Sequence, residues 1–175
     1  MYKNRVKISL VFLLLVFFQS ACGGSTSSSN NGVEISPQVG YLAPDFSLRT
    51  PDGSSIRLSD LRGYGVFINF WATWCGPCQN EMPDIQSIHE SYSGQGLIVL
   101  SVNQEDTASD VTDYANWMGM TFPIVLDSSA KVGETYLVWD IPYSYFVDKN
   151  GIIQSIYIGQ MSRDEMEERV WLVLP

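Results

Sequence analysis

The sequence is short of cysteine, histidine and basic residues. Its 175 residues include three cysteines, one histidine and ten lysines and arginines, against 19 aspartates and glutamates, which gives a formal charge of −9. An acidic surface repels phosphate backbones, and binding to them by counterion release needs clusters of Lys and Arg. We therefore expect no nucleic-acid partner. A zinc centre is also disfavoured, because a structural zinc ion takes about four ligands, supplied mostly by Cys and His.

The N-terminal hydrophobic run is too short to span a membrane. Residues 8–18 are apolar except for Ser9 and follow a basic head of Lys3, Arg5 and Lys7. As a helix this run reaches about 16 Å, whereas the hydrocarbon core of a bilayer is about 30 Å thick. We predict that residues 1–21 are a secretory signal peptide rather than a spanning helix.

The residues that end this segment resemble a lipobox. Ser20 and Ala21 are small and precede Cys22 directly, as in bacterial lipoproteins, in which the cysteine is lipidated and becomes the mature N-terminus. Gln19 departs from the Leu-like residue that is usual three positions before the cysteine. The resemblance implies lipidation of Cys22 and attachment to a membrane face. Ordinary cleavage nearby and an uncleaved anchor are the alternatives.

Residues 22–40 are predicted to be a flexible tether, and residues 41–175 a single domain. Residues 23–32 contain only Gly, Ser, Thr and Asn, which bury no apolar surface to offset the entropy of ordering them. An exported chain also lies where disulfides persist. If Cys22 carries lipid, Cys75 and Cys78 are the two remaining thiols. Loss of the three signal-peptide cations leaves seven cations against 19 acidic residues, a net charge of −12.

The pattern of the domain predicts an α/β fold with a mixed central sheet and helices on both faces. Turn signals at Pro51-Asp52-Gly53 and Asn150-Gly151 indicate two hairpins. Ser162 and Glu165 have the spacing of a capping box. The expected elements are strands at 46–48, 55–58, 65–70, 97–102, 122–126, 143–147 and 152–158, and helices from Cys78 to Tyr92, at 107–118, at 129–137 and from Ser162.

The strongest chemical signal is Cys75-Gly76-Pro77-Cys78, at a predicted strand-to-helix junction. The thiolate is the nucleophile in disulfide exchange, and an ordinary cysteine is only about 3% ionised at pH 7. A helix N-terminus stabilises an anion by up to about 2 kcal/mol, or about 1.5 pK units. Gly76 and Pro77 leave Cys75 accessible, and Cys78 is placed one turn later to attack a mixed disulfide on Cys75. The motif therefore predicts a redox-active pair.

Two other interpretations of the pair are weaker. As a structural disulfide it would close a four-residue ring, which stabilises by only about 2 kcal/mol, against about 4.7 kcal/mol for a hundred-residue loop. As a zinc site it would need His89, which lies eleven residues after Cys78 and so about 16 Å along the helix axis. We expect no metal and no cofactor, and place His89 on the helix surface or at the edge of the core.

Several segments resemble one family. Residues 69–78 (NFWATWCGPC), Ala43-Pro44-Asp45-Phe46 and residues 119–123 (GMTFP) are similar to the TlpA/ResA-type thiol-disulfide oxidoreductases of the thioredoxin superfamily. The resemblance runs from about Tyr41 to Trp171. It implies a thioredoxin-like fold with an added N-terminal β-hairpin. It also implies an extracytoplasmic, membrane-tethered enzyme that reduces disulfides in exported proteins, often apocytochrome c, and is re-reduced by a membrane thiol donor.

The resemblance assigns roles around the cysteines. Cys75 becomes the attacking thiol and Cys78 the resolving thiol. Glu81 matches an acidic residue three positions after the second cysteine, where a carboxylate can accept a thiol proton or raise the thiol pKa by repulsion. Its alternative role is a solvated helix residue. Thioredoxins carry an acid where this chain has Asn69, which shifts proton handling toward Glu81.

Substrate contacts are expected on both sides of the pair. Ile141-Pro142 matches the cis-proline loop of the family, which offers the backbone of residue 141 to an extended substrate. Asp140 and Tyr143 depart from the Gly and the Thr or Ser that are usual beside that proline. Trp74, with Gly76 and Pro77, is expected to be exposed contact surface, and Trp71 to belong to the core.

Four aromatic residues are candidates to line an apolar groove around the cysteines. Trp71, Trp74, Trp139 and Tyr143 are its candidate lining. The acidic residues that follow the predicted strand at 97–102 are assigned to a solvated loop and helix start, with no function. These are Glu105, Asp106, Asp110 and Asp113.

Two other functions are open. A peroxiredoxin-like peroxidase shares the Ala-Pro-Asp-Phe segment, but its Pro-x-x-x-Thr-x-x-Cys pattern would need Pro at Ile68 and Thr at Ala72. A binding lipoprotein on a thioredoxin scaffold would carry an idle disulfide, and loss of all exchange activity in the purified protein would favour it.

Overall fold

The sheet is built around β3 (Gly65–Trp71), in which every residue is buried. A nearly continuous apolar strand of this kind is typical of a sheet covered on both faces. β3 pairs in parallel with β4 (Leu97–Gln104) and antiparallel with β6 (Tyr143–Val147). The carboxyl ends of β3 and β4 and the amino end of β6 therefore lie at the same edge of the sheet.

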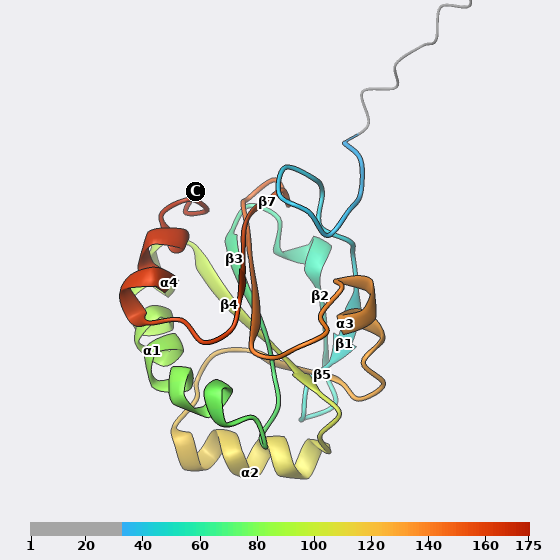
Figure 1. Ribbon diagram of the computed structural model, residues 1–175, viewed down its shortest axis with the longest axis vertical. Coiled ribbons are helices and arrows are strands. Elements are labelled where there is room, and N and C mark those ends of the chain that lie inside the picture. Colours follow the sequence, from blue (N-terminus) through green and yellow to red (C-terminus); the bar gives the residue numbers. More distant parts are fainter. Residues whose placement is uncertain (1–32) are drawn as a thin grey trace, which may run out of the picture. The chain divides into compact units, whose positions relative to one another are not determined.

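The computed structural model describes residues 33–175 (Figure 1). The predicted signal peptide, Cys22 and the first part of the tether lie outside the described residues. The strand order is β2-β1-β5-β4-β3-β6-β7. The outer strands are β1 (Ser47–Arg49), β2 (Ser55–Arg57), β5 (Ile124–Asp127) and β7 (Ile153–Ile158).

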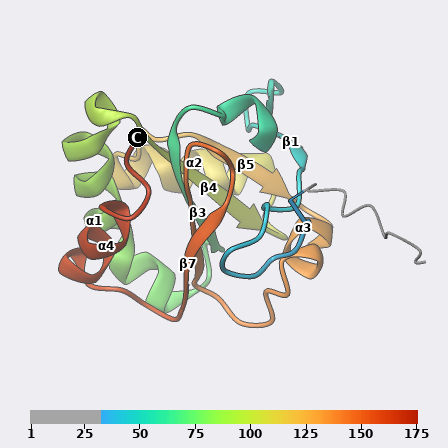
Figure 2. The same ribbon diagram turned by 90° about the horizontal axis from the view of Figure 1, so that it is seen from above.

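Helices cover both faces of the sheet (Figure 2). Side chains of α1 (Gly76–Tyr92), α2 (Ala108–Met118) and α4 (Arg163–Val170) join one buried cluster, which also contains Phe67 and Trp71 of β3. The short α3 (Lys131–Thr135) lies over the other face, where Tyr136 is fully buried, and the N-terminal hairpin β1-β2 extends the sheet beyond β5. The predicted thioredoxin-like fold, with its mixed sheet and added hairpin, is confirmed.

Local signals in the sequence explain where the helices begin and end. Thr107 caps α2 by accepting a hydrogen bond from the Asp110 N–H at 3.2 Å, and Gly119 ends that helix at φ +69°. Ser162 and Glu165 form the predicted capping box of α4. Such caps satisfy backbone groups that have no partner within the helix. Two short 3₁₀ turns, Leu58–Leu61 and Ser93–Gln95, complete the regular structure.

Part of the predicted tether is joined to the domain. The Gly40 N–H donates to the Ile153 carbonyl at 2.8 Å, and the Leu42 N–H donates to the Glu34 carbonyl at 3.0 Å. Hydrogen bonds therefore join residues on both sides of the boundary that the sequence placed at residue 41.

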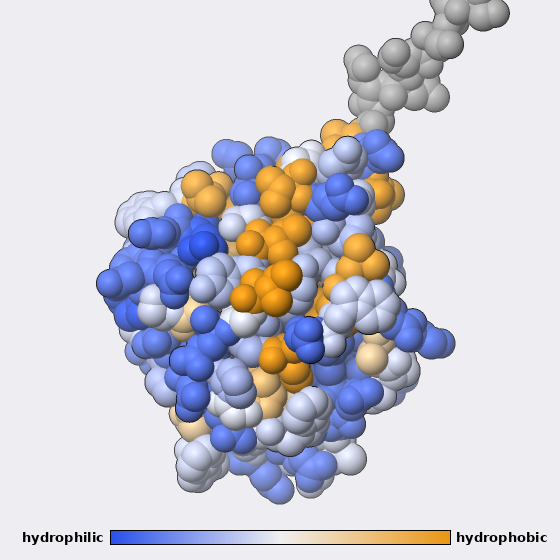
Figure 3. Space-filling view, in the orientation of Figure 1, coloured by the Kyte–Doolittle hydropathy of each residue, from blue (hydrophilic) through white to orange (hydrophobic). Residues whose placement is uncertain are grey.

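One face of the domain carries an apolar band among hydrophilic residues. Figure 3 shows this band along the middle of the face on which β7 runs. On β7, Ile156 is half-buried and Ile158 is exposed. Among the residues described, no helix has the length and apolar character needed to cross a bilayer.

Candidate active site

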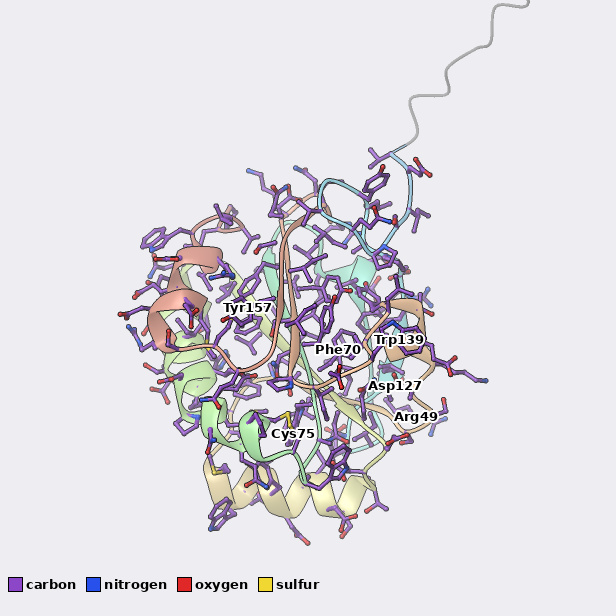
Figure 4. All side chains as sticks on the ribbon, in the orientation of Figure 1. Arg49, Phe70, Cys75, Asp127, Trp139 and Tyr157 are labelled. Carbon is purple, nitrogen blue, oxygen red and sulfur yellow. A yellow bond between two sulfur atoms is a disulfide. The ribbon has the colours of Figure 1, made fainter. Side chains whose placement is uncertain are left out.

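Cys75 and Cys78 form a disulfide at the N-terminus of α1. Cys75 is the N-cap residue, and its Sγ accepts a hydrogen bond from the Cys78 N–H at 3.2 Å. This sulfur therefore occupies the place where a helix stabilises negative charge, as the sequence predicts. Figure 4 labels Cys75 at the start of the helix.

The two cysteines differ in their exposure to solvent. Cys75 is 5% exposed and Cys78 is fully buried. The residues around Cys75 are open, because Gly76 and Pro77 are exposed and Trp74 is 65% exposed. Cys75 is thus the sulfur that an approaching thiol or disulfide reaches first.

The cis-proline loop lies directly against this sulfur. The Ile141–Pro142 peptide bond is cis, in agreement with the resemblance. The carbonyl oxygen of Ile141 is 3.6 Å from Cys75 Sγ. Proline has no N–H, so Pro142 itself presents no backbone donor beside the disulfide.

Glu81 is fully buried on α1, three residues after Cys78. One carboxylate oxygen accepts from Asn69 Nδ2 and the other from the Met161 N–H, each at 2.9 Å. Burial raises the pKa of Glu81 to about 7, although both hydrogen bonds oppose the rise. A solvated role for Glu81 is therefore wrong, and its carboxyl group titrates close to neutral pH.

Asn69 links Glu81 to the sheet. Its Nδ2 also donates to Ser144 Oγ at 3.1 Å, and Ser144 is its cross-strand neighbour on β6. Its Oδ1 is buried without a partner among the described residues. A rotation of the amide would turn this acceptor toward Glu81, so Asn69 is able to serve both protonation states of the carboxyl group.

Asp106 has a role that the sequence analysis missed. Its carboxylate accepts from the Thr73 N–H at 2.7 Å, from the Thr73 hydroxyl at 2.9 Å and from Asn103 Nδ2 at 2.7 Å. It is therefore not a solvated loop residue, but holds the segment just before Trp74 and Cys75. The position of Asp106 after a parallel strand was the available signal, because active-site groups gather at the carboxyl ends of such strands.

The predicted aromatic groove forms only in part. Trp74 and Trp139 line the same pocket, and both are exposed. Trp71 is fully buried in the cluster beneath α1, as expected. Tyr143 stacks on Tyr145 with ring centroids 5.3 Å apart and belongs to the cluster on the opposite face. Tyr143 is not among the residues that line the pocket.

His89 lies away from the disulfide. It is half-buried on α1, and its ring packs edge-on against Phe122 with centroids 6.0 Å apart. The position at the core edge is confirmed, and burial lowers the pKa of His89.

Comparisons with known proteins agree with this geometry. The AhpC/TSA family matches residues 39–156. The thiol-disulfide oxidoreductase ResA of Geobacillus kaustophilus is 35% identical over 173 residues, covering 99% of each chain.

Two solved structures are similar as well. A thiol:disulfide interchange protein of Chlorobium tepidum is 25% identical with a TM-score of 0.70, and the match covers 77% of this chain and 96% of that one. The exposed lipoprotein thioredoxin of Streptococcus pneumoniae is 32% identical with a TM-score of 0.63, covering 73% and 98%. The cysteine pair, the fold and these relatives lead to one conclusion: this chain belongs to the AhpC/TSA family and is a thiol-disulfide oxidoreductase of the ResA type.

Proposed function

We propose that the protein is a lipid-anchored, extracytoplasmic reductase of disulfides in exported proteins. The observation that carries the proposal is the placement of Cys75 Sγ between the α1 N-terminus and the Ile141 carbonyl. The first feature favours a thiolate, and the second offers a backbone acceptor to an extended client. Gly76 and Pro77, together with exposed Trp74, leave this sulfur the more accessible of the two.

The reaction proceeds in two exchange steps. In the reduced protein, the Cys75 thiolate attacks one sulfur of the client disulfide, so a Cys75–client bond forms and the second client sulfur leaves as a thiolate. Cys78 then loses its proton and attacks Cys75 Sγ, which forms the Cys75–Cys78 disulfide and releases the first client sulfur. Both leaving thiolates take up protons, and two electrons pass from the protein to the client.

Glu81 is the proton acceptor in the second step. It follows Cys78 by about one turn of α1, and both residues are fully buried. A carboxyl group with a pKa near 7 accepts and returns a proton at neutral pH. The other buried carboxyl group in the part of the chain that the structure describes, that of Asp127, ends β5 and accepts from the Gly133 N–H of α3 instead.

The cellular setting follows from the N-terminal residues. A lipidated Cys22 would hold the domain at a membrane face, and a membrane thiol donor would reduce the Cys75–Cys78 disulfide after each turnover. The pneumococcal relative described as an exposed lipoprotein thioredoxin supports this arrangement. Apocytochrome c before haem attachment is the proposed client within the class of exported proteins.

The test is client capture by the full-length Cys78→Ser chain in a bacterial host. Without the resolving thiol, the mixed disulfide on Cys75 persists, so we expect dithiothreitol-sensitive complexes in the membrane fraction. Adding Cys22→Ala should move the complexes to the soluble fraction, and Cys75→Ser with Cys78→Ser should capture nothing. Capture that does not depend on Cys75 would refute the catalytic role, and membrane retention without Cys22 would refute the anchor.

A further inference from the structure

A pocket beside the disulfide is not used by the exchange reaction. It has a volume of about 240 Å³, and its lining includes the aromatic residues Trp74 and Trp139, together with Ile141. Trp139 follows α3 in the chain and is 78% exposed (Figure 4). Ile141 places its carbonyl 3.6 Å from Cys75 Sγ, and Trp74 precedes Cys75 in the chain, so two lining residues of the pocket neighbour the reacting cysteine.

The polar lining of this pocket is acidic. Glu105 and Glu134 both line it, and neither carboxylate takes part in an ion pair or a side-chain hydrogen bond within residues 33–175. No Lys, Arg or His is among the lining residues. The nearest basic residue on α3, Lys131, is exposed and forms no ion pair within the same residues. The pocket therefore holds uncompensated negative charge.

A buried amide adds a second, independent observation. Gln104 lines the pocket and is only 8% exposed, yet its side-chain amide makes no hydrogen bond within the described residues. A Cβ added at Gly133 would lie 1.9 Å from Gln104 Nε2, so the amide fills the space that this glycine leaves. Although Gln104 is buried as a residue, its amide atoms keep some access to solvent, since they are not among the fully buried polar atoms without a partner. A polar ligand group that enters the pocket would therefore hydrogen-bond to the amide in place of water.

We propose that this pocket binds a lysine or arginine side chain of the client, next to the client's reacting cysteine. The proposal rests on the proposed function and names the feature of the client that the site selects. The aliphatic stem of the cationic residue lies along Trp74 and Trp139, which also attract its charge through their ring faces. Its charged group meets Glu105, Glu134 and Gln104.

The neighbourhood of the pocket and Cys75 limits which client residue can be selected. An extended chain advances about 3.3 Å per residue, and Ile141 belongs both to the pocket and to the surroundings of Cys75 Sγ. The selected residue therefore lies one or two positions from the client cysteine.

The experiment compares three peptides that each contain one disulfide and differ only in the residue after the first cysteine. That residue is Lys, norleucine or Glu. The reduced wild-type protein should reduce the Lys peptide about fivefold to tenfold faster than the norleucine peptide, with the Glu peptide slowest. In the Glu105→Gln, Glu134→Gln double variant, the Lys-to-norleucine ratio should fall toward one. The Glu134→Lys variant should favour the Glu peptide over the Lys peptide.

A matched control removes equal charge elsewhere. Asp113 on α2 and Glu168 on α4 are exposed and do not line the pocket, so the Asp113→Asn, Glu168→Gln variant should keep the wild-type ratio. Equal rates with all three peptides in the wild-type protein would overturn the subsite and leave the reductase function intact. Failure to reduce any of them would overturn the proposed function, and the subsite with it.

Discussion

Glu81 is the residue at which stability and chemistry oppose each other. Its carboxyl group is buried beneath the active-site helix, with two donors directed at it. Those donors favour the charged form, but burial outweighs them and raises the pKa to about 7. Burial of the charged carboxylate therefore destabilises the folded protein at high pH. The same burial gives Glu81 a pKa at which it accepts a proton near neutrality.

Replacing Glu81 by Gln should remove a pH dependence of stability. The folded-state pKa is about 7 and the ordinary value is 4.5, so the folded protein binds more protons than the unfolded chain between these values. The contribution of Glu81 to stability is therefore full below about pH 4.5 and is lost as pH rises through 7, by about 3 kcal/mol in total. Urea unfolding of the oxidised proteins from pH 5 to 8 should show this loss in the wild-type protein relative to the Glu81→Gln variant.

The same variant should also change the exchange kinetics. A glutamine at this position keeps the hydrogen bonds if Asn69 rotates, because Asn69 Oδ1 has no partner among the described residues. It cannot accept a proton, so the resolution of a mixed disulfide on Cys75 should slow about tenfold or more near pH 7. An inflection near pH 7 that persists in Glu81→Gln would show that another group titrates.

Some active-site residues could be predicted from the sequence, and others could not. Cys75 and Cys78 belong to a motif whose spacing alone indicates the chemistry, whereas Pro142 was predicted only from the family resemblance, and the structure places the proline loop against the cysteine pair. The burial of Glu81 could not be read from the sequence, because it depends on Met161, which lies eighty residues later. The role of Asp106 depends likewise on Thr73, thirty-three residues earlier. Local patterns do not reveal pairs of this separation.

At the scale of elements, the active site is held by the junctions that follow β3 and β4. These parallel strands run side by side over their whole common length, so the residues that follow them emerge at one edge. Asp106, after β4, holds Thr73, after β3, with two hydrogen bonds. The register of two strands thereby fixes the start of α1.

Replacing Asp106 by Ala should loosen this junction. The change leaves the Thr73 N–H and the Asn103 amide without their acceptor in a half-buried site, which costs about 1–3 kcal/mol of stability. The helix start that carries Cys75 should become less ordered, so the exchange rate should fall as well. Urea unfolding and the rate with a small neutral disulfide measure the two effects. Exposed Asp113→Ala is the control, and equal losses in both variants would contradict the positioning role.

Most elements were predictable because their signals are local. Buried apolar runs marked β3 and β4, and caps or turn residues marked α2, α4 and both hairpins. β5 begins two residues later than expected, at Ile124, because Pro123 has no N–H to donate to the ladder. The hydrogen bonds of residues 34–42 could not be foreseen, since their partners include the distant Ile153.

At the scale of the whole molecule, negative charge acts on a client over a long range through the net charge and over a short range inside the pocket. Without the predicted signal peptide, the chain carries a net charge of −12, which attracts cationic clients over a distance set by the ionic strength. The Debye length is about 10 Å at 0.1 M salt and about 3 Å at 1 M. Contacts inside a partly enclosed pocket are screened much less.

Varying the salt concentration should therefore separate long-range electrostatic attraction of the peptide from its short-range recognition in the pocket. Raising sodium chloride from 0.01 to 1 M should slow reduction of the Lys peptide several-fold, leave the norleucine peptide nearly unchanged and speed the Glu peptide. The Lys-to-norleucine ratio should decrease but stay above one in the wild-type protein, because the contacts with Glu105 and Glu134 act at short range. In the Glu105→Gln, Glu134→Gln variant the Lys-to-norleucine ratio should reach one at high salt.

The Asp113→Asn, Glu168→Gln variant is the control, because it has the same net charge as the pocket variant. A difference between the ratios of the two variants at 1 M locates the selectivity in the pocket. Identical ratios in the two variants would assign the whole preference to the overall charge of the molecule.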